Sequence, residues 1–242
     1  MTLRTAFLLN CIFSLTLHCS ASDIHTLAQA VDDHYNHLRS LQADFIETYR
    51  GNGANRSESG VLWLKKPGLQ KPGKMRWEYR SSEVHPSEVH PNEVHSNDGK
   101  DYAKLFVSDG KDAWFYVPGD RQARRSPVKQ LDDLRSPISF LLGKTKLEKE
   151  LQGLSPAPDV APIGTGNVVL RGVPKYMQER VSQVLLEITP SNQIARIVIE
   201  EADGATTEYR FTNQRENVEI SDAQFHFVPP AGVEVISGEF GQ

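Results

Sequence analysis

Several short runs of the chain predict β-strands that are apolar on both faces. In residues 61–64 and 113–117 every side chain is apolar or aromatic. These two runs and a third, residues 75–79, each hold one of the three tryptophans. A sheet with one face in water alternates apolar and polar positions, so such strands need an apolar neighbour on each side. Two interpretations stay open: a strongly curved barrel with one packed core, or a curved sheet whose concave face holds a hydrophobic ligand.

One amphipathic helix is predicted ahead of these strands, over residues 22–41. Polar side chains occupy one face of it. The apolar side chains recur every three or four positions and share the other face: Ile24, Leu27, Val31, Tyr35, Leu38 and Leu41. Such a helix either covers a core or closes a cavity, and the pattern by itself favours neither.

After residue 42 the pattern changes to short alternating runs separated by turn residues, which is typical of an antiparallel meander. Gly110 and Gly204 stand in two predicted hairpin turns, where a positive φ is favourable. A short helical interruption is predicted over residues 136–143, which begin with Ser-Pro and end with glycine. A weaker one follows over residues 146–151. We therefore predict a mainly β protein of about eleven strands.

The first residues are typical of a secretory signal peptide. A basic residue, Arg4, precedes an apolar stretch over residues 6–17, and small residues surround the predicted cleavage site after Ala21. We therefore divide the chain into a signal peptide, residues 1–21, and one domain, residues 22–242.

The two cysteines bear on anchoring and on chemistry. Cys19 could carry a lipid anchor if its neighbours matched a lipobox, but the residue directly before it is His18 rather than a small one. We expect an unanchored mature protein. Cys11 and Cys19 both precede the predicted cleavage site. A mature chain without thiols excludes disulfides, thiolate catalysis and cysteine-ligated metals.

The charge balance argues against nucleic acid as a partner. The chain has 27 lysines and arginines against 31 acidic residues, a formal net charge of −4, and carries no strongly basic field. Beyond the signal peptide no apolar run is long enough to span a bilayer. Neither a G-x-S-x-G nor an H-E-x-x-H motif occurs, so we expect neither an enzyme nor a cofactor.

Residues 82–96 form a low-complexity insertion of three similar pentads of the type Ser-Glu-Val-His-Pro. The repeat supplies His85, His90 and His95, which could bind zinc or copper if the loop folded around an ion. A spacing of five places them on neither one helix face nor one strand face, and the prolines oppose both structures. We expect a solvated loop without a metal site, and its role stays open.

Five segments occur in an order and at spacings that carry a resemblance to a known family: residues 41–45, 60–65, 71–79, 107–116 and 227–233. Together they extend over most of the mature chain. On these segments the chain resembles the LolA family, the periplasmic carriers of outer-membrane lipoproteins. The resemblance implies an unclosed, strongly curved antiparallel β-barrel with an N-terminal helix and a short helical lid over a hydrophobic cavity.

The resemblance also implies transport without chemistry. Such a carrier is a periplasmic monomer that accepts acylated lipoproteins from an inner-membrane ABC complex (LolCDE-like), shields their acyl chains and passes them to an outer-membrane receptor (LolB-like). Two alternatives stay open. One is a carrier or sensor of another lipid on the same fold. The other is the outer-membrane receptor itself, which the context of Cys19 argues against.

Seven residues are expected at the acyl-chain cavity and its lid: Trp63, Met75, Trp77, Phe115, Ile138, Phe140 and Leu141. In the family an arginine before a proline helps to hold the lid shut. Here this place falls on Lys66 or Lys71, because Lys-Pro-Gly occurs twice. Lysine keeps the charge but lacks the planar fork of arginine. Strands that are apolar on both faces show no apolar–polar alternation, so the pattern leaves open which face lines the cavity.

Overall fold

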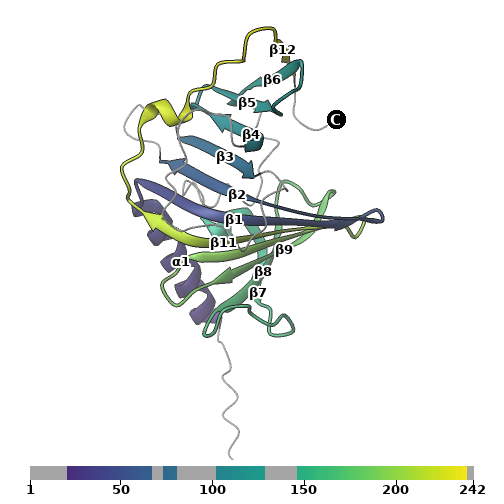
Figure 1. The fold of residues 1–242 in the computed structure, drawn as a ribbon. Helices are drawn as coiled ribbons and strands as arrows, with labels where there is room; N and C mark the ends of the chain where they lie inside the picture. Colours follow the sequence, from purple (N-terminus) through teal and green to yellow (C-terminus); the bar gives the residue numbers. More distant parts are fainter. Residues whose placement is uncertain (1–20, 67–72, 81–101, 129–145, 239–242) are drawn as a thin grey trace, which may run out of the picture.

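The computed structural model describes residues 21–66, 73–80, 102–128 and 146–238. These residues form one large, twisted β-sheet with a helix against one of its faces (Figure 1). The prediction of a mainly β, unclosed and largely antiparallel sheet is confirmed, with a 12-stranded sheet in place of the smaller one expected.

The elements follow one another along the chain with these bounds: α1 Ala21–His37, β1 Ser40–Gly51, β2 Ala54–Lys65, β3 Lys74–Arg80, β4 Tyr102–Ser108, β5 Asp112–Tyr116, β6 Gln122–Pro127, α2 Leu147–Glu150, β7 Leu151–Pro156, β8 Val168–Pro174, β9 Val181–Ile188, β10 Ile194–Glu201, β11 Thr206–Glu216, the 3₁₀ turn η4 Asp222–Phe225, and β12 Glu234–Ser237.

The sheet consists of two meanders that meet at β1 and β11. Strands β1 to β6 lie in sequence order on one side, strands β7 to β11 on the other, and β1 pairs with β11 in antiparallel fashion. β12 runs parallel to β6 at one end of the sheet. β12 and β7 stand at opposite ends of the strand order and do not pair within the described residues, so the sheet stays unclosed.

α1 covers one face of the sheet, hereafter the α1 face. The Tyr35 hydroxyl of α1 accepts a hydrogen bond from the backbone N–H of Ile194 at 2.9 Å, which ties the helix to β10. Apolar side chains of the helix and of strands on both sides of β1 form one core here: Ala28, Val31, Tyr35, Leu38, Phe45, Leu62, Leu64, Trp77, Leu170, Leu186, Ile197 and Phe211.

The predicted helix of residues 22–41 ends earlier in the structure. α1 stops at His37, and β1 begins at Ser40. Leu41 fits a helical spacing from the preceding residues, but it also fits the two-residue period of Leu41, Ala43 and Phe45, all of which are buried in β1. Leu41 is paired with residues of both neighbouring strands, so it belongs to β1 and not to the helix.

A second apolar cluster lies on the opposite, outer face. Lys65 and Asp222 fasten the covering C-terminal segment through an ion pair of 2.7 Å. Strand residues on the outer face and the residues that cover them are Val61, Trp63, Leu105, Val107, Ile220 and Phe225. The strands that are apolar on both faces therefore have a separate cover on each side: α1 on one, and residues 218–227 on the other.

Several predicted segments lie outside the described residues. They are residues 1–20 of the predicted signal peptide, the repeat at 82–96 and the helical interruption at 136–143. Of the second predicted interruption, α2 is present, and its Leu147 N–H donates to the carboxylate of Asp32 at 3.0 Å. Within the described part of the chain, no helix combines the length and the apolar character that crossing a bilayer requires.

Candidate functional site

Five aromatic side chains meet on the α1 face and are hereafter the aromatic cluster: Phe45, Trp77, Tyr79, Tyr209 and Phe211. The ring centroid of Phe45 lies 4.8 Å from that of Trp77 and 5.0 Å from that of Tyr79, both edge-to-face. Tyr209 and Phe211 are stacked on β11, and Tyr209 lies 5.9 Å from Trp77. Pairs of this geometry contribute roughly 0.5–1.5 kcal/mol each beyond the burial of their area.

The strand register brings these rings together around a glycine. Phe45 of β1 is paired with Gly60 of β2, and Gly60 with Tyr79 of β3. A Cβ atom at position 60 would lie 2.0 Å from the carbonyl oxygen of Glu78 and 2.7 Å from the Phe45 ring. Glycine is required here because any side chain would push the strands and rings apart.

Three of the predicted cavity residues share the α1 face. Trp77 is only 4% exposed and belongs to the core under α1, with Met75 packed against that core. Trp77 pairs with Phe106 of β4, and Phe106 pairs with Phe115 of β5. Direct cross-strand partners point to the same side of a sheet. The α1 face is therefore apolar from β2 to β5.

Trp63 lies on the other side of the sheet. It packs in the outer cluster beneath Phe225 and is 8% exposed. The structure therefore does not bring Trp63 together with Met75, Trp77 and Phe115. The run that contains Trp63 is apolar at every position. Its sequence therefore does not indicate which of its side chains point toward α1 and which point to the outer face.

Lys66, one of the two predicted latch residues, has a buried ammonium group. Its Nζ lies 5.8 Å from the centroid of the Tyr35 ring and makes no hydrogen bond to a described residue. Burial lowers the pKa of Lys66 to about 7. A buried ammonium is costly unless hydrogen-bond acceptors surround it. Lys71 and the predicted lid residues lie outside the described residues: Ile138, Phe140 and Leu141.

Charged side chains and tyrosine hydroxyls border the aromatic cluster on the side of the β1–β2 hairpin. They form the polar rim: Glu47, Glu58, Tyr79, Tyr209 and Lys104. The Tyr79 hydroxyl donates to Glu47 Oε2 at 2.7 Å. Lys104 Nζ lies 2.7 Å from Glu58 Oε2 and 3.8 Å from the centroid of the Tyr79 ring. Burial and the nearby charge of Glu47 raise the pKa of Tyr79 and of Tyr209 above the usual range, so both hydroxyls stay protonated.

The pattern of the sequence does not predict the polar rim. Glu47 and Glu58 face each other only because the β1–β2 hairpin pairs them, and Lys104 arrives through its pairing with Tyr79. One signal was available: Glu47 stands two residues after Phe45, so it shares the apolar side of a predicted strand. An acidic residue at such a position requires a specific partner.

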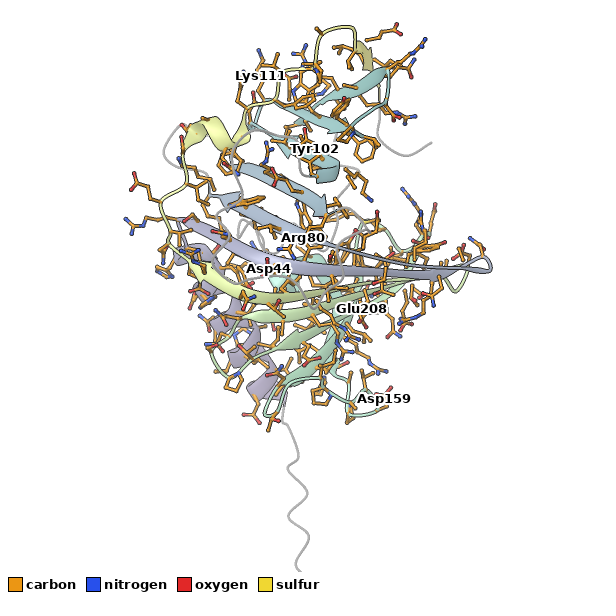
Figure 2. All side chains as sticks on the ribbon, viewed as in Figure 1. Asp44, Arg80, Tyr102, Lys111, Asp159 and Glu208 are labelled. Atoms are coloured by element: carbon orange, nitrogen blue, oxygen red, sulfur yellow. The ribbon has the colours of Figure 1, made fainter. Side chains whose placement is uncertain are left out.

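Charges on the outer face pair with one another. Asp44, which precedes the inward-facing Phe45, lies 3.0 Å from Arg80 of β3, and the two side chains lie close together in Figure 2. Further along this face, Arg196 Nε lies 2.8 Å from Glu187 Oε2. Arg196 also lies 3.8 Å from Glu208, which Figure 2 places on the lower half of the sheet. These groups balance one another's charge and stabilise the fold.

A shallow pocket of about 500 Å³ lies where the end of α1 meets the sheet. His34 Nε2 lies 2.9 Å from Glu216 Oε1 at its wall. The lining residues are Ala30, Asp33, His34, His37, Leu38, Asn192, Glu216 and Asn217. No set of three or more histidine, cysteine and acidic residues in the described ranges is arranged to hold a metal ion.

Comparison with known proteins places the chain in a family. The family model described as outer membrane lipoprotein carrier protein LolA matches residues 89–228, more than half of the chain. A relative from Chromobacterium violaceum, named outer-membrane lipoprotein carrier protein, is 28% identical over 202 residues, 83% of this chain and 82% of its own. One of the same name from Nitrosospira multiformis is 27% identical over 237 residues, 96% and 95% of the two chains.

Among solved structures, a LolA superfamily protein from Nitrosomonas europaea matches 84% of this chain and 97% of its own, at 12% identity and a TM-score of 0.41. The match of the family model over more than half of the chain decides the assignment: this chain belongs to the LolA family of outer-membrane lipoprotein carrier proteins.

Proposed function

We propose that this protein carries acylated lipoproteins through the periplasm, from the inner to the outer membrane, and catalyses no reaction. The observation that carries the proposal is the aromatic cluster, a broad apolar core on the α1 face of an open sheet in a LolA family member. The relatives that match nearly the whole chain are named outer-membrane lipoprotein carrier proteins, which supports the class of cargo.

The free energy of burying hydrocarbon explains why a carrier of this kind buries its acyl chains only in part. Burying hydrocarbon is worth about 0.8 kcal/mol per CH₂. Full burial of three ordinary acyl chains would therefore exceed the ceiling of roughly −20 kcal/mol on non-covalent affinity. A carrier that bound its cargo so tightly could not release it. In the empty protein, side chains already pack against one another on the α1 face. Cargo must separate these side chains, and the free energy this costs reduces the net binding energy and keeps transfer reversible.

The acyl chains contact Met75, Trp77 and Phe115 in this proposal, since these share the α1 face. Ile138, Phe140 and Leu141 cover the chains as a lid, as the family resemblance implies. Trp63 is assigned to holding the C-terminal segment instead, because it packs against the outer cluster.

Trp77 and Trp63 offer a matched test of this assignment, because both are buried and lie on opposite faces. Trp77→Leu is expected to reduce the amount of lipoprotein released from inner-membrane vesicles about tenfold. This is the effect of losing roughly 40–50 Å² of apolar contact with the acyl chains. Trp63→Leu removes the same group from the other face and should leave release within about twofold of wild type. Circular dichroism establishes that both variants are folded.

Equal losses in the two variants would contradict the placement of the acyl chains on the α1 face. Wild-type protein that releases no lipoprotein, and that co-purifies with a phospholipid or with no lipid at all, would contradict the proposed function itself. Mass spectrometry of the ligand extracted from the periplasmic protein separates these results.

Lys66 rather than Lys71 is the latch in this proposal. Its buried ammonium needs acceptors, and carbonyl groups of the lid would supply them. Lys66→Met is expected to weaken the closed state, so that the protein binds a hydrophobic dye several-fold more strongly and retains less cargo. Lys71→Met is the matched control and should behave as wild type. If Lys71→Met gave the effect and Lys66→Met did not, the other copy of the duplication would be the latch.

Delivery requires a partner at each membrane. We propose that an inner-membrane ABC complex of the LolCDE kind loads the protein and that an outer-membrane receptor of the LolB kind unloads it, with the protein acting as a monomer between them. Adding purified receptor should move labelled lipoprotein from this protein to the receptor.

A further inference from the structure

The polar rim carries a net negative charge at the border of the proposed acyl-chain surface. Glu47 and Glu58 contribute two negative charges and Lys104 one positive charge, and both tyrosines are neutral. Lys104 is already engaged, because its ammonium binds Glu58 at 2.7 Å and lies over the Tyr79 ring at 3.8 Å. The rim therefore holds one uncompensated carboxylate, that of Glu47, which accepts a hydrogen bond from the neutral Tyr79 hydroxyl.

The rim also offers hydrogen-bonding capacity that the described residues do not use. Tyr209 is directly paired with Glu47 across β1 and β11, and its ring is part of the aromatic cluster. Its hydroxyl makes no hydrogen bond to a described residue, so it can donate to a ligand placed beside it. Glu47 can accept further hydrogen bonds, since an ionised carboxylate has about four lone-pair sites.

Lipids that place their chains on the aromatic cluster would bring their head group to this rim. A lipid-modified peptide joins its chains through esters and an amide, which are uncharged. Ester carbonyls can accept from the Tyr209 hydroxyl, and an amide N–H can donate to Glu47. A phospholipid also carries its chains on glycerol esters, but it lacks the amide, and a phosphodiester joins its glycerol to the head group. Its negative charge would meet Glu47 with no unengaged cation in the described rim.

We propose that the polar rim selects the uncharged ester-and-amide linkage of acylated peptides and rejects the anionic phosphate group of phospholipids. This inference rests on the proposed function and adds the basis of its selectivity. Specificity of this kind often depends on a repulsive group aimed at the wrong ligand. Arg56 lies further out on the same hairpin, exposed to water and stacked on Tyr49 at 5.0 Å, so its charge is screened by solvent and lies outside the rim.

Glu47→Gln tests the inference because glutamine keeps an acceptor for Tyr79 while removing the charge. Full-length mature protein is titrated with two fluorescent probes in neutral detergent: a synthetic triacylated cysteinyl peptide and phosphatidylglycerol. We expect the preference for the peptide to fall about tenfold in Glu47→Gln at low salt, as one removed charge a few ångströms from the phosphate implies. The difference should shrink in high salt.

Glu200→Gln is the matched control, since Glu200 bonds Gln183 on the outer side of β10 and carries the same charge. It should leave the preference unchanged. Normal peptide binding by Glu47→Gln with an unchanged preference would overturn the inference, and so would loss of both ligands by a folded Glu47→Gln. Wild-type protein that binds neither probe would instead contradict the proposed function, so the two failures are distinguishable.

Discussion

At the scale of single residues, Glu187 shows how one buried carboxylate organises a loop. It is 1% exposed on β9, and its Oε1 accepts from the backbone N–H groups of Ile163 and Gly164 and from the Asn167 side chain, at 2.8–2.9 Å. Burial raises the pKa of Glu187, but these hydrogen bonds and the charge of Arg196 outweigh it and leave the pKa below the usual range. The ionised form is thus the one that the folded protein stabilises.

The substitution Glu187→Gln is expected to lower the free energy of unfolding by about 3 kcal/mol at pH 7, because it removes the nearer of the two counter-charges of the buried Arg196. A carboxylate with a depressed pKa stabilises the fold above its unfolded pKa of about 4.3, and this stabilisation is lost as pH falls through its folded pKa. Urea unfolding should therefore show the difference from wild type shrinking below about pH 4. The exposed Glu179→Gln should show little difference at any pH. A cost that stayed constant down to pH 3 would contradict this account.

At the scale of elements, α1 is held by one buried hydrogen bond as well as by its apolar face. The Tyr35 hydroxyl accepts from the backbone N–H of Ile194, and both residues are fully buried or nearly so. This bond ties α1 to one position along β10.

Removing that acceptor should be costly. Tyr35→Phe leaves the Ile194 N–H buried and unsatisfied, so we expect the free energy of unfolding to fall by about 1–3 kcal/mol. Tyr49→Phe is the control, because the Tyr49 hydroxyl accepts only a long, exposed bond from Asn52 at 3.5 Å. Denaturant unfolding of both variants measures the difference. Equal stabilities of the two variants would mean that the Tyr35 hydrogen bond does not help to hold α1, which would leave its apolar face and the Asp32–Leu147 bond to do so.

At the scale of the whole molecule, the sheet tolerates a long insertion between two strands that are already in register. Arg80 at the end of β3 pairs directly with Tyr102 at the start of β4. The chain between them, which contains the pentad repeat, therefore leaves and returns at neighbouring positions. A short turn suffices to connect such a pair of strands.

Deletion of residues 82–96 should accordingly leave the fold and lipoprotein release unchanged, because residues 81 and 97–101 remain to close the hairpin. Calorimetric titration with zinc should give the same small heat for the full and the shortened protein, since we expect no metal site in the repeat. If the shortened protein released less lipoprotein, the repeat would have a role in transport. If the heat of zinc binding disappeared with the deletion, the repeat would have a role in metal binding.

Hydrophobic periodicity along the sequence determined the class of fold and most of the elements. Alternation and turn residues predicted the antiparallel meander, and the strands that are apolar on both faces correctly indicated two apolar covers. The same local patterns did not predict where the first helix ends or which face of the sheet Trp63 occupies. Leu41 fits both a helical and a strand period, and Trp63 stands in a run without alternation. Local spacing contains no information that could resolve either case.

The tertiary structure alone decided which side chains share a face and which charges meet. Trp77 and Trp63 point in opposite directions because β2 and β3 pair in one register, and Glu58 meets Lys104 only across three neighbouring strands. Such meetings depend on contacts between residues far apart in the chain. Their energies are set by burial and distance, which a linear sequence does not specify, and this is why the polar rim emerged only from the fold.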